Sequence, residues 1–235
     1  MGLDSDELRN PLLQLHSNVS TNCMQTHLRH RQIDYYDKIT DKFIGKINVE
    51  SFDLDMIKKR FSIPMDYSMR TNKNMDLYLG KLGYDFGDDK IDLPVDLEKI
   101  VKSNFLTTND CVTLKGFGHR INPIFDTAFE KCDWEYNETH FHPDSFAKGD
   151  DEIEYLKLAL ECGKRLSYRL SNRFKNDKFR IQISFMETQW VNGEIDVYGS
   201  STVRFYKIRP EAEDGIYISD LDVYEGNGVL ELERI

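Results

Sequence analysis

The sequence lacks several features that would assign it to a large class of proteins. It has no long apolar run, and a membrane-spanning helix needs about 20 predominantly apolar residues. Residues 1–14 contain Asp4, Asp6 and Glu7, whereas a secretory signal peptide begins with basic residues and continues into an apolar stretch. The sequence therefore predicts neither a membrane protein nor a secreted one.

Cysteine is scarce, and its spacing excludes the usual clustered sites. The four cysteines are Cys23, Cys111, Cys132 and Cys162, and no two of them form a Cys-x-x-Cys pair. Such pairs are typical of structural zinc sites and of thiol redox centres. We therefore expect reduced thiols in a reducing compartment, and we predict a cytoplasmic protein.

Basic residues are outnumbered by acidic ones, 31 to 41, which gives the chain a formal net charge of −10. A negative surface repels phosphate backbones and anionic lipids. We therefore predict no nucleic-acid partner and no membrane partner, whereas a basic protein would be attracted. The chain has 235 residues, 40% of them hydrophobic, which is enough to bury a core.

The clearest periodic pattern predicts a helix from Asp151 to Phe174. Apolar or small residues recur there at steps of three and four: Ile153, Leu156, Leu160, Gly163, Ser167, Leu170 and Phe174. Asp151 followed by Glu154 is typical of a capping box at the start of a helix. Gly163 and Ser167 leave little bulk on the apolar stripe, so we expect a sheet to pack closely across this helix.

Alternating residues after the helix predict a strand over 179–185. Apolar side chains occupy every second position there and polar ones lie between them, which is typical of a strand buried on one face. This pattern favours an antiparallel sheet with one solvated face. Two further strands are predicted at 216–224 and 229–232, and we expect the last strand to be paired, because a free apolar edge promotes aggregation.

A hairpin is predicted around Asn192-Gly193, since both residues tolerate the positive φ of a type I′ turn. It should join a strand that ends near Val191 to one that starts near Glu194. Pairing outward from this turn would misalign the apolar faces by one residue. We therefore predict a bulge within 199–201, which places Ile183 opposite Val203 and Ile181 opposite Phe205.

The predicted fold class is α+β, with a mainly helical N-terminal part (1–106) and an α+β part (111–235) that together form one continuous domain or two. The second part would contain an antiparallel sheet of about four to six strands with the long helix on one face. Residues 107–110 are the only plausible linker. The other predicted elements are helices at 18–47, 54–61, 95–105 and 124–132 and strands at 111–114 and 134–142.

A first candidate site lies at His140 and His142. On a strand, both imidazoles would point to one face and could bind a divalent metal, with Asp144 and a recruited His119 as further ligands. The spacing resembles the His-x-His-x-Asp-His signature of metallo-β-lactamase-fold hydrolases, with Ser145 in place of its last histidine. The resemblance implies a metal-dependent hydrolase with a divalent metal, which is the alternative to the main prediction that the protein has no cofactor. The favoured alternative is a pair of surface histidines.

A second candidate is the segment Lys115-Gly116-Phe117-Gly118-His119-Arg120. Gly116 and Gly118 could shape a backbone nest for a phosphate or carboxylate, and His119 and Arg120 would add positive charge. The third glycine of a dinucleotide-binding fingerprint and the lysine of a P-loop are both missing. A glycine-supported turn is therefore the favoured alternative.

Acidic residues on the late strands form the third candidate. Paired carboxylates serve acid–base catalysis only when they are held together in a pocket, whereas an antiparallel sheet normally presents them to solvent. Acids mixed with exposed tyrosines are typical of a protein-binding surface. We therefore predict a non-enzymatic binding protein of the inhibitor or immunity type, which presents an acidic, tyrosine-containing surface to a basic protein. Its candidate residues are Glu194, Asp196, Tyr198, Asp220 and Asp222.

Overall fold

The computed structural model describes residues 31–36, 43–49, 66–83, 91–116, 123–149, 151–212 and 217–234. The chain divides into two units, Met1–Asp53 and Leu54–Ile235. In the first unit, β1 (Arg31–Tyr36) pairs with β2 (Phe43–Val49) in an antiparallel hairpin. The helix predicted over 18–47 is wrong over these residues, and a mainly helical N-terminal half is not confirmed. The helix predicted at 54–61 lies outside the described residues.

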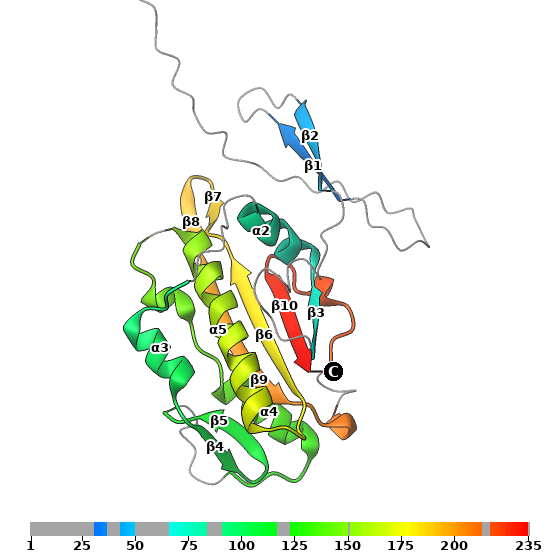
Figure 1. The fold of residues 1–235 in the computed structure, drawn as a ribbon. Helices are drawn as coiled ribbons and strands as arrows, with labels where there is room; N and C mark the ends of the chain where they lie inside the picture. The colour runs from blue at the N-terminus through cyan, green and yellow to red at the C-terminus, as the bar shows by residue number, and fades with distance from the viewer. Residues whose placement is uncertain are drawn as a thin grey trace, which may run out of the picture. The chain divides into compact units, whose positions relative to one another are not determined.

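The second unit contains an antiparallel sheet of four strands in the order β3-β10-β6-β9, as Figure 1 shows. The strands are β3 (Tyr67–Thr71), β10 (Gly228–Arg234), β6 (Phe179–Met186) and β9 (Ser200–Lys207). Strand β10 therefore lies inside the sheet, paired on both sides, which confirms that the last strand is paired. Helices and antiparallel strands together make the fold α+β.

Helix α5 (Glu152–Arg173) crosses one face of this sheet (Figure 1). It begins after Asp151, whose carboxylate accepts a hydrogen bond from the amide of Ile153 at 3.1 Å. A Cβ atom added to Gly163 would lie 2.6 Å from Cδ1 of Ile183 in β6, so any larger residue would require Ile183 to move. The predicted helix and its close packing against a sheet are confirmed. The other helices of the described residues are α2 (Lys73–Gly83), α3 (Val95–Lys102) and α4 (Ala128–Glu138).

Residues 105–114 form a small hairpin and not a linker. Strand β4 (Phe105–Thr108) pairs with β5 (Cys111–Leu114), and the turn residues Asn109 and Asp110 have φ angles of 49° and 68°. The strand predicted at 111–114 is confirmed, and the linker predicted at 107–110 is wrong.

The strand predicted at 134–142 is also wrong, because α4 continues through Glu138. A capping box starts this helix: the hydroxyl of Thr127 accepts from the amide of Glu130, and the Glu130 carboxylate accepts from the amide of Thr127. Beyond the helix, only Phe141 pairs with β9, through two backbone hydrogen bonds to Val203.

The short helices η1 (Pro143–Phe146), η2 (Pro210–Ala212) and η3 (Leu221–Val223) connect the larger elements. Helix η3 lies where the sequence predicted a strand over 216–224. Residues 217–224 are described and form no strand, so this prediction is wrong. No helix among the described parts of the chain is long and apolar enough to cross a membrane.

The polar face of the sheet is covered, which corrects the prediction of one solvated face. Arg180 and Gln182 are 1% and 5% exposed. The amide of Gln182 accepts from the hydroxyl of Tyr136 at 2.9 Å, and this tyrosine comes from α4. Arg180 donates to Glu233 at 2.7 Å and to the hydroxyl of Tyr206 at 2.6 Å. Paired polar groups can be buried at small net cost, so polarity alone does not imply a wet face.

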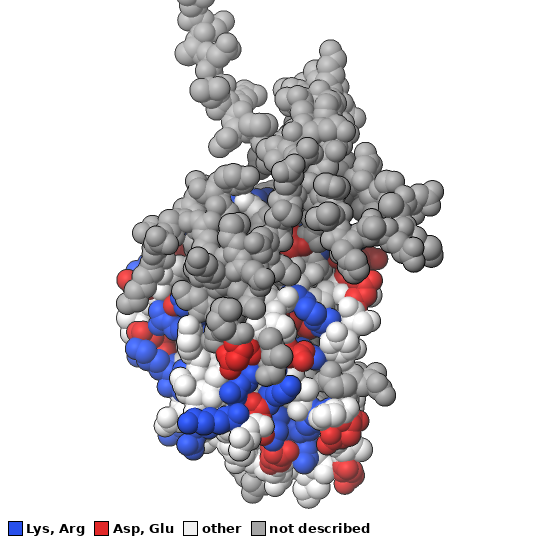
Figure 2. Space-filling model, turned by 45° about the vertical axis from the view of Figure 1, so that its right-hand side comes forward, with Lys and Arg blue, Asp and Glu red and all other residues white. Residues whose placement is uncertain are grey.

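The charges of this face balance locally. Although burial opposes its charge, the pKa of Arg180 is raised by Tyr206 and Glu233. Arg70 binds Glu231, and its guanidinium lies 4.5 Å from the ring centre of Tyr217. Figure 2 shows lysine and arginine side chains interspersed with aspartate and glutamate on the side of the molecule drawn there.

Between β6 and β9 the chain forms a third hairpin, β7 (Gln189–Val191) and β8 (Glu194–Val197). Its turn residues Asn192 and Gly193 have φ angles of 53° and 86°, as predicted. Ile183 pairs with Val203 and Ile181 with Phe205, so the predicted register is confirmed. The extra residue lies between Ile195 and Val197, however, and not within 199–201.

Candidate functional site

The histidines of the predicted metal site lie on the surface beside η1. Both His140 and His142 are exposed, and their ring centres are 5.7 Å apart. The Nδ1 atom of His140 donates a hydrogen bond to the carbonyl oxygen of Asn137, and that of His142 lies 3.4 Å from the hydroxyl of Thr202. The two histidines are the neighbours of Phe141 in sequence, and Phe141 forms an isolated β-bridge with Val203. Their side chains therefore lie on the same side of this short segment, although it is not a strand.

The third predicted ligand, Asp144, is engaged elsewhere. Its carboxylate accepts from the amide of Ser201 at 2.8 Å and from the hydroxyl of Ser201 at 3.2 Å, which fastens η1 to β9. Within the described parts of the chain, no group of three or more His, Cys, Asp or Glu side chains is arranged to hold a metal. His119 lies outside those parts, so the complete predicted ligand set is not tested.

The predicted anion site at Gly116, Gly118, His119 and Arg120 is described only at its first residue. Gly116 is exposed and has a φ angle of 98°, a conformation that favours glycine. The other three residues lie outside the described ranges. The backbone nest therefore remains a prediction.

The five predicted partner-binding residues fall into two groups. Glu194, Asp196 and Tyr198 lie on or beside β8 and are exposed. Asp220 and Asp222 lie at η3, where the carboxylate of Asp220 accepts from the amide of Asp222 at 3.0 Å. The Asp222 carboxylate is 2.9 Å from Nζ of Lys73 and also accepts from the Lys73 amide, so it holds η3 against the start of α2.

The β7–β8 hairpin is exposed over its whole length, although it is rich in apolar side chains. Trp190 is 63% exposed and Tyr198 is 74% exposed. Its aliphatic side chains are also exposed: Val191, Ile195 and Val197. Both strands pair only with each other among the described strands, so each also has an unpaired outer edge. Exposed aromatic residues and free strand edges are both typical of protein-binding surfaces.

The base of this hairpin is fixed to α5. The Glu152 carboxylate accepts hydrogen bonds from the amide of Thr188 at 2.9 Å and from the Thr188 hydroxyl. That hydroxyl in turn accepts from the amide of Gly199 at 2.8 Å. A Cβ atom at Gly199 would lie 2.6 Å from the Glu152 carboxylate, which explains the glycine. The hairpin is therefore presented from a defined position, which lowers the entropy lost on binding.

A buried ion pair, Glu135 with Arg209, was missed by the sequence analysis. Arg209 donates to the Glu135 carboxylate at 2.7 Å, and the amides of Val112 and Lys207 donate to it at 2.6 and 2.9 Å. Burial raises the pKa of the Glu135 carboxyl, and Arg209 opposes this shift. Because the carboxylate joins β5, α4 and β9 and its oxygens are occupied, we assign it a structural role.

The cysteines of the described residues do not form a reactive centre. Cys111, Cys132 and Cys162 are buried free thiols. Burial raises the pKa of Cys111 to about 12 and also raises the pKa of Cys162. A thiol with a raised pKa is protonated at neutral pH and is a poor nucleophile.

A scan against protein-family models, a search of curated proteins and a search of solved structures each return no match. The strongest guide to function is therefore the hairpin itself. The sequence pointed to its acids and to Tyr198 but not to Val191, Ile195 and Val197. A signal was present in the first strand, because the consecutive apolar residues Trp190 and Val191 fall on both of its sides, which no single buried face explains.

Proposed function

We propose that this chain is a non-enzymatic binding protein that engages a basic protein through the β7–β8 hairpin, as an inhibitor or immunity protein does. The observation that carries the proposal is the exposure of Trp190 and Tyr198 on a hairpin whose base is held by Glu152. Tryptophan and tyrosine are the residues that most often dominate binding energy at protein interfaces.

The charge of the hairpin supports a basic partner. Residues 188–203 include Glu194 and Asp196 but no lysine or arginine. Both acids are exposed, and neither forms an ion pair with another described residue. Together with the net charge of −10, they would accelerate the approach of a positively charged surface. The partner's contact surface should therefore combine basic side chains with a pocket for an aromatic ring.

The proposal is tested by affinity capture with the full chain and two variants. Trp190→Ala/Tyr198→Ala removes the aromatic side chains of the hairpin, and Tyr168→Ala removes a tyrosine that is 44% exposed on α5. A true partner should be a basic protein that the native chain and the Tyr168→Ala control retain. The double variant should lose it, with affinity reduced about 100-fold or more, since two interface hot spots contribute at least about 2 kcal/mol each.

The association rate of the purified pair gives a second criterion. Raising the salt concentration should slow association sharply, and Glu194→Lys/Asp196→Lys should slow it further, because both changes weaken electrostatic attraction. An acidic partner, a salt-insensitive association rate or equal retention by the Trp190→Ala/Tyr198→Ala variant would contradict the proposal.

A further inference from the structure

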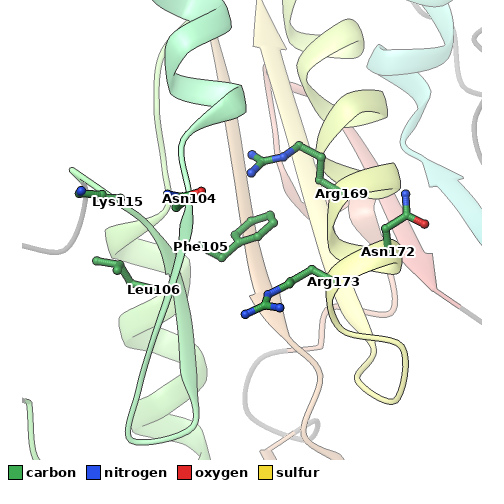
Figure 3. A pocket seen from close by; sticks show the side chains of 7 residues that line it. All are labelled: Asn104, Phe105, Leu106, Lys115, Arg169, Asn172 and Arg173. Carbon is green, nitrogen blue, oxygen red and sulfur yellow. The ribbon is translucent and has the colours of Figure 1, made fainter.

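A basic pocket lies between the β4–β5 hairpin and the last turns of α5. None of its described lining residues belongs to the β7–β8 hairpin. Its volume is about 690 Å³, within the range of small-molecule sites. Figure 3 shows the ring of Phe105 between the guanidinium groups of Arg169 and Arg173, both of which extend from α5 toward it. The lining residues are Asn104, Phe105, Leu106, Lys115, Arg169, Asn172 and Arg173.

The described lining of the pocket is positively charged. Its described lining includes Lys115, Arg169 and Arg173 but no acidic residue. Among described residues, none of these three cations forms an ion pair, and Lys115 and Arg173 form no side-chain hydrogen bond. Five other described arginines differ in this respect, whereas Arg204 also forms no ion pair with a described residue and stacks on the ring of Tyr136 at 4.2 Å. Ion pairs to carboxylates hold Arg70, Arg165, Arg180, Arg209 and Arg234.

Arg169 is held in position without losing its charge. Its guanidinium donates to the carbonyl oxygens of Val101 and Ser103, the latter at 2.7 Å, and lies 4.6 Å from the ring centre of Phe105. That ring packs edge-on against Phe174 at 5.5 Å between centres. Burial lowers the pKa of Arg169. An anion beside it would therefore offset a charge that the fold leaves uncompensated.

Lys115 and Arg173 lack such structural roles. The backbone amide of Lys115 donates to the carbonyl oxygen of Asn104 at 2.7 Å, which brings its side chain to the pocket, but the side chain itself is exposed. Arg173 ends α5, where a cation gains only a few tenths of a kcal/mol up to about 1 kcal/mol from the helix dipole. Helix stability alone does not explain why Arg169 and Arg173 both extend toward Phe105, whereas Lys115 points away from them (Figure 3).

We propose that this pocket binds a small phosphorylated molecule, with its phosphate beside Arg169 and Arg173. Arginine matches phosphate because its planar donors bind two oxygens at once. A phosphate alone would fill only part of the cavity. The side-chain amide of Asn104, which also lines the pocket, could bind a polar group on the remainder of the ligand.

Calorimetric titration of the full chain at low salt tests this site, with inorganic phosphate, AMP and ATP as probes. At least one probe should bind saturably. Arg173→Ala should weaken that binding tenfold or more, since a charged hydrogen bond is worth at least about 1.5 kcal/mol. Lys148→Ala removes an exposed positive charge outside the pocket and should leave the affinity unchanged. Circular dichroism and melting temperature establish that both variants are folded.

The probes also distinguish the source of the phosphate. Equal affinity for inorganic phosphate and AMP would mean that the phosphate alone is recognised, whereas tenfold tighter binding of AMP would mean that the pocket also recognises the nucleoside. Absence of saturable binding, or equal weakening by Arg173→Ala and Lys148→Ala, would overturn the proposal. So would tighter, Arg173-dependent binding of a single-stranded oligonucleotide, which would make the pocket part of a nucleic-acid surface.

Discussion

Two antiparallel chain segments pair first as β6 with β9, the inner half, and then as β7 with β8, the outer half. The two halves differ in burial. In the inner half, Ile181, Ile183 and Phe205 are at most 1% exposed. In the outer half, every residue of β7 and β8 is exposed, including Trp190. Burial of apolar surface stabilises the inner half, whereas the apolar residues of the outer half bury less surface and contribute less to folding. Those outer residues are therefore free to serve a partner.

The largest effect is expected at Arg180, on the polar face of the inner half. Arg180→Ala should lower the free energy of unfolding by about 3 kcal/mol or more, because it removes a buried cation that donates hydrogen bonds to Tyr206 and Glu233. Chemical denaturation measures the loss. Lys178→Ala, which removes an exposed positive charge two residues earlier, is the control and should change stability by less than about 0.5 kcal/mol. A loss below about 1 kcal/mol for Arg180→Ala would mean that this face is open to solvent.

An intermediate effect is expected at the turn of the outer half. Gly193 has a φ angle of 86°, so Gly193→Ala should cost about 1 kcal/mol. The cost is limited because the outer strands can separate while the inner sheet stays folded. The midpoint of urea denaturation measures it, with Gly149→Ala as the control, since an added Cβ there meets no atom within 4 Å. Equal midpoints for the two variants would show that the turn is not held in this conformation.

The smallest effect on stability is expected at Trp190. Trp190→Ala should change the free energy of unfolding by less than about 0.5 kcal/mol, because the side chain is 63% exposed. Thermal and urea denaturation check this value. A loss above about 1 kcal/mol would show that the indole packs within the chain, and the hairpin would then have a structural role in place of a binding one.

Local patterns in the sequence predicted much of the sheet. The helix that ends at Arg173 and the pairing of Ile183 with Val203 follow from the periods of 3.6 and 2 and from one turn dipeptide. The exact position of the bulge could not be predicted in the same way, since any extra residue between the turn and Val203 restores the same register.

The polar face of the sheet was misread because alternation does not say what covers a face. Arg180 and Gln182 alternate with apolar residues whether their partners are water or protein. Their partners Tyr136 and Glu233 come from distant parts of the chain. Helix α4 was misread for a related reason, since its buried Glu135 is stabilised by Arg209 and looks solvated in a hydropathy pattern. The Thr127-x-x-Glu130 capping box was the signal that could have revealed it.

The candidate sites were only partly predictable. The acids and Tyr198 of the hairpin stand beside a recognisable turn, so composition was informative there. The basic pocket joins Phe105 and Lys115 to Arg169 and Arg173 across more than 50 residues of sequence. Arg169 and Arg173 share a helix face at a spacing of four residues, but their common neighbours depend on tertiary packing.

The position of β10 between β3 and β6 has a consequence for biosynthesis. Its hydrogen bonds reach residues more than 150 positions earlier, as in the contact between Ser68 and Glu233. The ribosome delivers β10 after β3, β6 and β9, so the sheet cannot close while these segments emerge. Closure over so long a loop is slow, so β3 and β6 each keep an unpaired strand edge until β10 has emerged.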